Sequence, residues 1–383
     1  MIEGKPMIHV PTAALQLRQR VFEPMKGVFV GKDGIIDLMG VALAAGENLF
    51  LLGPPGTAKT ALVHEMTRRL GAKSFDYLLT RFTEPNELFG PFDIRRLREG
   101  ELVTNTAGML PEADVVFLDE LLNANSAILN GLLMVLNERV FRRGAETRAV
   151  PALMVVGASN QLPEDEALRA LFDRFLLRVR CGPVTDEQLG AVLAAGWVMG
   201  RREEVGVGPG AEMVREIQRG LTAVAMDGVR DELIGLVRRL RAAGVGVSDR
   251  RAVRLQRAVA GSALMAGRGE ARLSDLWVLA HVWDREEQME MVAALVRAVV
   301  EREGMVAGDH PGAGGGGEPD AEALARELDG LESRWGAGLA DPAAGDVLRL
   351  LAERVQWVRV VEARERLEAK CRELWARRAG GPD

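Results

Sequence analysis

Short apolar runs alternate with amphipathic helical patterns from residue 49 to about residue 183. Each run has the length of a buried strand, and each helical pattern places its apolar residues three or four positions apart. Alternation of this kind predicts a parallel sheet with helices on both faces. The predicted strands are Leu49–Leu52, Phe75–Leu79, Val115–Leu118, Ala152–Gly157 and Leu176–Val179. Residues 1–48 read as a helix, a turn and a second helix, so residues 1–183 are expected to form one α/β domain.

Residues 184–303 lose the strand pattern and keep the helical one, which predicts an all-α domain after the α/β core. Its expected helices are Val214–Ala225, Asp231–Ala242, Arg251–Met265, Leu273–Trp283 and Gln288–Val300. Residues 304–320 contain Gly-Ala-Gly-Gly-Gly-Gly and two prolines, which is typical of a flexible linker. Residues 321–383 read as a C-terminal helical segment, with helices expected at Ala321–Leu331 and Val347–Arg378. This segment either folds back on the body or serves as a docking or oligomerisation module.

Two arginine-rich hairpins are expected to interrupt the α/β alternation. The first joins residues 92–97 to residues 102–106, and the second joins residues 139–141 to residues 147–150 through a loop with Gly144. They are either solvated loops or arms that reach a neighbouring subunit or a substrate, and spacing alone leaves both readings open.

Composition narrows the class of protein. The chain has 383 residues, 48% of them hydrophobic and 27% charged, with a formal net charge of −6. A large core is therefore possible, and the acidic balance argues against a general nucleic-acid binder. Cys181 and Cys371 lie far apart, and the four histidines show no ligand spacing, so neither a disulfide framework nor a zinc site is predicted. Without a signal pattern or a membrane-length apolar run, we expect a cytoplasmic protein with no membrane insertion.

The stretch from Leu49 to Thr60 predicts a phosphate-binding loop, or Walker A motif. A strand, a Gly-rich loop and the start of a helix direct backbone N–H groups at one point. Lys59 adds a positive charge near the β- and γ-phosphates, and the Thr60 hydroxyl can ligate Mg²⁺. The predicted nucleotide-binding residues here are Gly53, Pro54, Pro55, Gly56, Thr57, Ala58, Lys59 and Thr60. Ala58 stands where the usual pattern has glycine, and we expect it near the first helical turn, where alanine is acceptable.

Polar residues end two of the other predicted strands. Asp119 and Glu120 follow Val115–Leu118, as in a Walker B motif, and ligands bind at the carboxyl ends of such strands. Asp119 is expected to hold Mg²⁺ with Thr60, and Glu120 to act as the general base toward the attacking water. Asn160 is a candidate for orienting that water, although Asn is also common at the start of a turn.

Two arginine positions complete the candidates. Arg174 lies between apolar residues in Leu171-Phe-Asp-Arg-Phe175, so a finger that stabilises the transferring phosphoryl group is one reading and a solvated charge is the other. Ser248-Asp-Arg-Arg251 opens a helix of the all-α domain. Ser248 or Asp249 can cap that helix, and Arg250 or Arg251 could reach a nucleotide.

These motifs, in this order, resemble the MoxR family of AAA+ ATPases, and most of all its RavA-type branch. The resemblance covers about residues 10–300. The segments that carry it are Gly53–Thr60, Phe82–Gly90, Phe117–Glu120, Asn130–Glu138, Gly157–Asn160, Leu171–Phe175 and Val247–Arg251. It implies an αβα P-loop NTPase core with an all-α lid, normally assembled as a hexameric ring with ATP between subunits.

The resemblance also implies residue roles. Lys59, Thr60, Asp119, Glu120 and Asn160 would act within one subunit, and Arg174 on the nucleotide of its neighbour. Arg250 matches the lid's sensor arginine best, with Arg251 as the alternative. Val30 and Gly31 match the region that touches adenine. The hairpin at residues 92–106 matches the insert near the second helix, and the one at residues 139–150 matches the hairpin before the sensor strand.

Family members usually act with a protein that carries a von Willebrand factor A domain, and they remodel or mature client proteins. The resemblance therefore implies an Mg²⁺-dependent ATPase with a chaperone-like role. A nucleic-acid motor is one alternative, which the net charge disfavours. A nucleotide-gated scaffold with little turnover is another, which would need Glu120 or Arg174 to be missing.

Overall fold

A computed structural model describes residues 9–144, 146–199, 208–304, 306–314, 321–336 and 361–379, together with Leu348, Leu351, Ala352 and Val355. The chain divides after Gly314 into two compact units. The first unit contains the α/β core and the helical lid, and the second contains the C-terminal helices.

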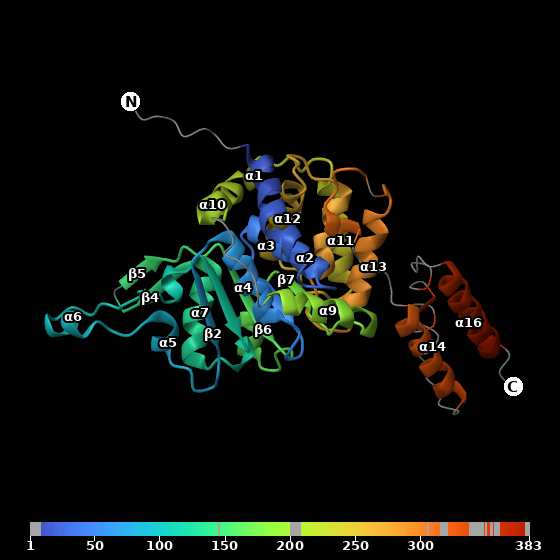
Figure 1. The fold of residues 1–383 in the computed structure, drawn as a ribbon, viewed down its shortest axis with the longest axis horizontal. Helices are drawn as coiled ribbons and strands as arrows, with labels where there is room; N and C mark the ends of the chain where they lie inside the picture. The colour runs from blue at the N-terminus through green and yellow to red at the C-terminus, as the bar shows by residue number, and fades with distance from the viewer. Residues whose placement is uncertain are drawn as a thin grey trace. The chain divides into compact units, whose positions relative to one another are not determined.

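The core is built on a parallel sheet of five strands in the order β2-β3-β6-β1-β7 (Figure 1). The strands are β1 Leu49–Leu52, β2 Ser74–Leu78, β3 Val115–Asp119, β6 Met154–Ser159 and β7 Leu177–Arg180. Every residue of β1 and β6 is buried, as expected for strands covered on both faces. The predicted α/β fold is therefore confirmed, and so is each predicted strand to within two residues.

Helices of the core cover the sheet and connect its successive parallel strands. They are α4 Lys59–Leu70, α5 Pro85–Phe89, α7 Ser126–Glu138 and α8 Glu166–Phe172, with short 3₁₀ turns at Leu110–Glu112 and Leu121–Asn123. Asn125 caps α7 by accepting hydrogen bonds from the amides of Ala127 and Ile128. Gly71, at a φ of +68°, ends α4 behind Arg68 and Arg69.

Only the second of the two predicted hairpins is a hairpin. Strands β4 Val140–Arg143 and β5 Glu146–Ala149 pair antiparallel, as expected. In the first, a single bridge joins Phe92 to Thr104, and the intervening chain forms the short helix α6 Ile94–Arg98. The Asp93 side chain accepts hydrogen bonds from the amides of Arg95 and Arg96, and this cap favours helix over strand.

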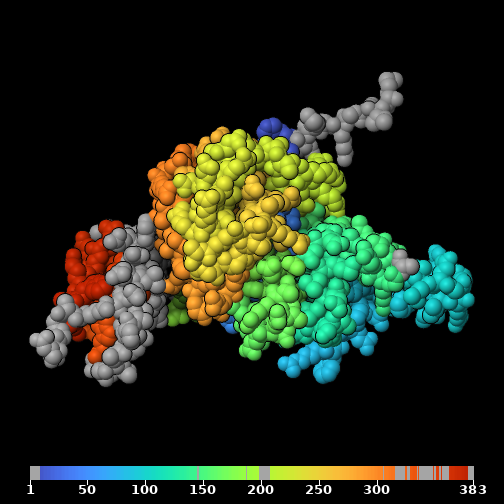
Figure 2. All heavy atoms as spheres, turned by 180° about the vertical axis from the view of Figure 1, so that it is seen from behind, coloured from blue at the N-terminus to red at the C-terminus, as the bar shows by residue number. Residues whose placement is uncertain are grey.

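The lid is all-α, as predicted, and packs on the N-terminal helices α1 Val10–Leu17 and α3 Asp33–Ala45. A further N-terminal helix, α2 Glu23–Lys26, packs on α3 and α4. A single turn of π-helix, Arg18–Phe22, connects α1 to α2. The lid helices are α9 Asp186–Met199, α10 Gly210–Gly220, α11 Arg230–Ala242, α12 Asp249–Met265 and α13 Gln288–Val300, with 3₁₀ segments at Leu221–Ala223 and Leu273–His281. Figure 2 shows the lid helices, in yellow and orange, beside the green and cyan core. Helix α12 packs along α3, so the lid and the core belong to the same compact unit.

Residues 306–314, which the glycine pattern assigns to a flexible linker, pack on the lid. His310 is buried and stacks on Trp277, with ring centroids 5.4 Å apart. Arg268 Nε donates to the carbonyl of Gly308 at 3.0 Å. A Cβ on Gly312 would lie 2.6 Å from the Trp277 ring, so this glycine permits close packing rather than flexibility. Residues 305 and 315–320 of the predicted linker lie outside the described residues.

The C-terminal unit has an apolar cluster of its own. Helices α14 Ala321–Gly336 and α16 Val361–Ala379 contribute to it, together with the helical residues Leu348, Leu351 and Val355. Arg377 pairs with Glu332 at 2.6 Å, and Lys370 pairs with Asp329. The predicted C-terminal helices are thus confirmed where the chain is described. Within those same ranges, no helix combines the length and apolarity that crossing a membrane requires.

Candidate functional site

The phosphate loop connects β1 to α4 and is held by its own carbonyl groups. Lys59 Nζ donates to the carbonyl of Gly53 at 2.7 Å and to that of Pro54 at 3.0 Å. The Thr57 hydroxyl also donates to the Pro54 carbonyl, at 2.9 Å. The ammonium group of Lys59 therefore lies at the loop and donates to its carbonyl oxygens. A phosphate oxygen could take the place of these carbonyls as the acceptor.

The end of β7 supports this loop. A Cβ on Gly53 would lie 2.0 Å from the carbonyl oxygen of Cys181, so only glycine fits there. The Cys181 thiol donates to the carbonyl of Thr57 at 3.1 Å, and the Cys181 amide donates to Leu52 at 2.7 Å. The sequence gives no signal for this role of Cys181, because the contact joins segments more than 120 residues apart.

Ala58 lies next to the first turn of α4, as expected, but its backbone is not helical. It precedes α4 as the N-cap residue, with φ +68° and ψ 19°. This left-handed conformation costs a residue with a Cβ roughly 1 kcal/mol relative to glycine. The strain explains why glycine is the usual residue at this position of the motif.

Thr60 and Asp119 come together, as predicted. The Thr60 hydroxyl lies 3.5 Å from Asp119 Oδ2. A hydroxyl and a carboxylate oxygen at this separation are ligands of the type that Mg²⁺ prefers, so the residues present fit the ion.

Glu120 turns away from the line of β3. It has a φ of +48°, and its amide donates to Asp119 Oδ1 at 3.0 Å. Non-glycine residues in this conformation carry strain and occur often at functional sites. Burial raises the pKa of the Glu120 carboxyl, the charge of Asp119 raises it further, and Lys59 opposes both. A raised pKa makes the carboxylate a stronger base.

Asn160 lies at the same edge of the sheet. It follows β6 directly and is exposed. The preceding residue, Ser159, accepts a hydrogen bond from the amide of Gly53 at 3.0 Å. The structure thus brings Asn160 beside the phosphate loop.

The turn with Val30 and Gly31 also lies close to the loop. Gly31 has a φ of +71°, and a Cβ there would lie 2.6 Å from Gln188 Oε1. Lys32 Nζ donates to the carbonyl of Gly182, which follows Cys181. Gln188 belongs to α9, so this turn, the end of β7 and the start of the lid surround one flank of the loop.

Arg174 lies at the opposite edge of the sheet. Its carbonyl accepts a hydrogen bond from Asn48 Nδ2 at 3.1 Å, and Asn48 is the residue before β1. The four residues of β1 separate Asn48 from the phosphate loop, a distance of about 15 Å. The guanidinium group of Arg174 pairs with Asp173 at 3.2 Å. Arg174 therefore does not lie at the phosphate loop of its own chain.

Arg250 and Arg251 lie on that same side. Arg250 Nη2 donates to Asn137 Oδ1 at 3.2 Å, at the end of α7. Arg251 is buried and donates to the carbonyl of Gly246 at 2.6 Å and to Asp284 Oδ1 at 2.9 Å. Ser248 caps α12 by accepting from the amide of Arg251 at 3.2 Å. Sequence reasoning expected one of these arginines to reach a nucleotide, and in the structure both make their contacts on the side of the sheet away from the phosphate loop of their own chain.

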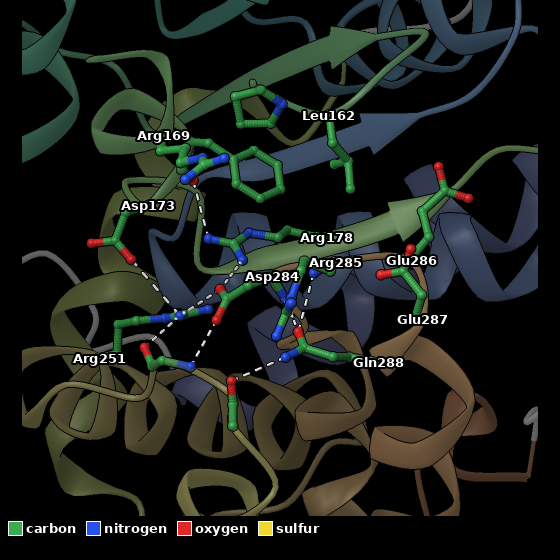
Figure 3. Close-up of a pocket in the computed structure, with 14 residues that line it drawn as sticks. Leu162, Arg169, Asp173, Arg178, Arg251, Asp284, Arg285, Glu286, Glu287 and Gln288 are labelled. Atoms are coloured by element: carbon green, nitrogen blue, oxygen red, sulfur yellow. Dashed lines mark hydrogen bonds and ion pairs between the residues drawn. The ribbon is translucent and has the colours of Figure 1, made fainter. Parts of the chain in front are cut away.

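Sequence reasoning missed the groups that hold the arginines in place at the amino ends of the strands. Asn48 is fully buried and contacts Arg174, Arg139 and the carbonyl of Leu136. Asp284 accepts from both Arg178 and Arg251 (Figure 3). The position of Asn48, a polar residue directly before an apolar strand, was the one signal that could have identified it as a structural contact. The sequence around Asp284 contains no such signal.

Comparison with known proteins identifies the family. Residues 15–218 match the model of the MoxR domain in the MoxR-vWA-beta-propeller ternary systems, and residues 228–296 match an AAA lid domain. The uncharacterized protein MJ0812 of Methanocaldococcus jannaschii is 34% identical over 278 residues, covering 72% of this chain and 74% of that protein. Chaperone MoxR1 of Mycobacterium tuberculosis is 29% identical over 176 residues, covering 45% of this chain and 46% of that protein.

A solved structure has the same fold. The crystal structure of a candidate ATPase from Cytophaga hutchinsonii superimposes with a TM-score of 0.62 at 19% sequence identity, covering 75% of this chain and 96% of that one. At this identity the likeness concerns the fold alone. The matches name the MoxR family, and the RavA-type branch stays a prediction.

Proposed function

The chain belongs to the MoxR family of AAA+ ATPases, and we propose that it hydrolyses ATP as a ring-forming, protein-remodelling enzyme whose sites each need two subunits. One observation carries the proposal. The phosphate loop and Glu120 lie at one edge of the sheet, whereas the carbonyl of Arg174 contacts Asn48 at the other edge. A single chain therefore cannot bring its own Arg174 to its own phosphate loop, and a neighbouring copy can.

Within one subunit, the proposed division of work follows the geometry. Lys59 and the loop amides bind the β- and γ-phosphates. Thr60 and Asp119 hold Mg²⁺, which neutralises charge on the phosphates when it is bound. Glu120 accepts a proton from the attacking water, and Asn160 orients that water. Val30 and Gly31 lie where the adenine would extend from the loop.

The neighbour supplies positive charge. Arg174 stabilises the charge that develops on the transferring phosphoryl group, as an arginine finger does. Arg250 lies on the same side of the chain as Arg174, so we assign it to the neighbour's nucleotide too. The resemblance named Arg250 as the sensor arginine of the lid, and this proposal adds which subunit's nucleotide it senses.

A protein with a von Willebrand factor A domain is the proposed partner, and a protein is the proposed client. The support is the description of the matching family model, which names ternary systems of MoxR, vWA and β-propeller components. Chaperone MoxR1, a relative in part of its length, is named for a chaperone role. A hexameric ring is the assembly we expect, because the family resemblance implies six copies and the proposed head-to-tail contacts form a ring when their rotation closes.

Glu120→Gln tests the proposed chemistry. The amide keeps the shape of the side chain but cannot accept the proton, so turnover should fall about 10²–10⁴-fold. ATP affinity, measured by calorimetry, should stay near that of the wild type. Glu164→Gln, an exposed carboxylate in the loop after β6, is the matched control and should keep full turnover. Near-normal phosphate release by Glu120→Gln would show that another residue is the base.

A further inference from the structure

Asp173 lies between two arginines that come from different parts of the chain. Its Oδ2 accepts from Arg174 Nη1 at 3.2 Å, and its Oδ1 lies 3.7 Å from Arg251 Nη1. Arg174 is the proposed finger, and Arg251 belongs to lid helix α12. Figure 3 shows the Arg251 guanidinium group between Asp173 and Asp284, joined to each by a dashed line. One carboxylate therefore contacts both the finger and the lid.

Arg251 has donors that the present arrangement does not use. Its Nη1 atom makes the contacts with the Gly246 carbonyl, Asp284 and Asp173. Its Nε and Nη2 atoms are buried and have no acceptor in the described part of the chain. The side chain is only 3% exposed, so water cannot easily compensate. Buried donors without a partner are unfavourable, and a second carboxylate interaction would satisfy them.

Asp173 is the carboxylate that can provide this interaction. Asp284 already accepts from Arg178, from Arg251 and from the amide of Gly246. The Asp173 side chain is 44% exposed and lines a cavity of about 790 Å³ together with Arg178, Arg251 and Asp284. It can therefore turn toward Arg251 without displacing packed atoms.

We propose that Asp173 is a positioning residue that restrains Arg174, and that the lid releases Arg174 by drawing the Asp173 carboxylate to Arg251. This inference rests on the proposed function, in which Arg174 acts on the nucleotide of a neighbour. In the structure Asp173 is closer to Arg174 than to Arg251. When the lid brings Arg251 closer, a bidentate pair forms and the Arg174 guanidinium becomes free to reach the neighbouring phosphates. Lid position in one subunit thus regulates hydrolysis in the next.

Opposite effects of two substitutions test the proposal. Asp173→Ala should raise steady-state turnover of the assembled enzyme about threefold, because a partly exposed ion pair contributes roughly that factor. Arg251→Lys should lower turnover about threefold, because lysine lacks the planar fork that draws Asp173 away. The double variant Asp173→Ala/Arg251→Lys should match Asp173→Ala alone. A purely structural role predicts that both single variants lose activity and that the double variant is the least active, which would overturn the proposal.

Controls separate the possible outcomes. Asp173→Glu keeps the charge and should retain wild-type turnover, and Glu166→Ala, an exposed residue on helix α8, which ends just before Asp173, should leave turnover unchanged. ATP affinity should stay constant in every variant. If thermal unfolding shows that Arg251→Lys does not fold, Asp173→Ala still decides, and unchanged or reduced turnover contradicts the inference. Arg174→Ala with full activity would overturn the proposed function itself, whereas an inactive Arg174→Ala with no gain in Asp173→Ala overturns only this inference.

Discussion

The polar groups at the carboxyl ends of the strands, here the carboxyl edge of the sheet, are arranged differently from those at the amino ends, the amino edge. At the carboxyl edge, Thr60 and Asn160 are exposed, and Lys59 bonds only to loop carbonyls. At the amino edge, Arg178 and Arg251 are buried and fixed by Asp284. The first edge has groups available for a ligand, and the second has cations already held in place. A site that needs both kinds of group must join the carboxyl edge of one chain to the amino edge of another.

Electrostatics at the amino edge support this reading. Burial opposes the charged form of Asp284, yet Arg251 and Arg178 together hold its pKa down at about 2. Burial and the nearby charge of Arg251 lower the pKa of Arg178 to about 10. Both groups therefore remain charged near neutral pH, and the cluster holds the segment before β7, where Arg174 lies, in a defined place.

Arg174→Ala should have the largest effect. Turnover of the assembled enzyme should fall about 10³-fold, because the transferring phosphoryl group loses its finger. The ATP affinity of the unassembled subunit should be unchanged, since Arg174 lies far from its own phosphate loop. Arg169→Ala, on helix α8, is the matched control. A loss of ATP affinity in the unassembled subunit would place Arg174 at the phosphate site of its own chain and contradict the proposed separation of the two edges.

Lys59→Ala tests the carboxyl edge in the same way. Loss of the charged donor should weaken ATP binding about 100-fold or more, as measured by calorimetry. Lys73→Ala, an exposed lysine after α4, should bind as the wild type does. Unchanged affinity in Lys59→Ala would mean that the loop is not the phosphate site.

Asp284→Asn should affect stability rather than binding. Because the folded-state pKa of Asp284 is lower than its ordinary value, the carboxylate stabilises the fold above pH 3.8, and this contribution is lost as the pH falls toward about 2. We expect a loss of about 2 kcal/mol in unfolding free energy at pH 7. The difference between wild type and variant should shrink on acidification below pH 4. A difference that stays constant down to pH 2 would contradict the ionic role.

Ala58→Gly should have the smallest effect. Glycine adopts the φ of +68° without strain, so the unfolding free energy should rise by about 0.5–1 kcal/mol. Chemical denaturation measures the change, and Ala61→Gly inside α4 should instead destabilise by a similar amount. If Ala58→Gly destabilises the protein, the result contradicts the assignment of a left-handed conformation to Ala58.

Local patterns in the sequence predicted the carboxyl edge well. The phosphate loop, Asp119 and Glu120 follow short apolar strands, and parallel strands end at one edge, so their residues meet. The same patterns could not predict the φ of Ala58 or the helix at Ile94–Arg98. Both depend on the backbone dihedral angles of individual residues, and the spacing of apolar residues carries no information about those angles.

The amino edge was largely invisible to sequence reasoning. Arg178 and Asp284 are 106 residues apart, and no periodicity relates them. Residues 306–314 have the composition of a linker, yet His310 and Gly312 pack on Trp277. Long-range packing of this kind decides where Arg174 and Arg250 lie, and so whether they serve their own chain or a neighbour.

Mixing two inactive variants tests the central claim most directly. Arg174→Ala subunits keep Glu120, and Glu120→Gln subunits keep Arg174. In an equal mixture, about a quarter of the interfaces join an intact Glu120 to an intact Arg174 from the next subunit, because each side must come from the right variant. Phosphate release by the mixture should therefore recover well above that of either variant alone. No recovery, with mixed assemblies demonstrated by native mass spectrometry, would contradict the assignment of the two edges to one shared site.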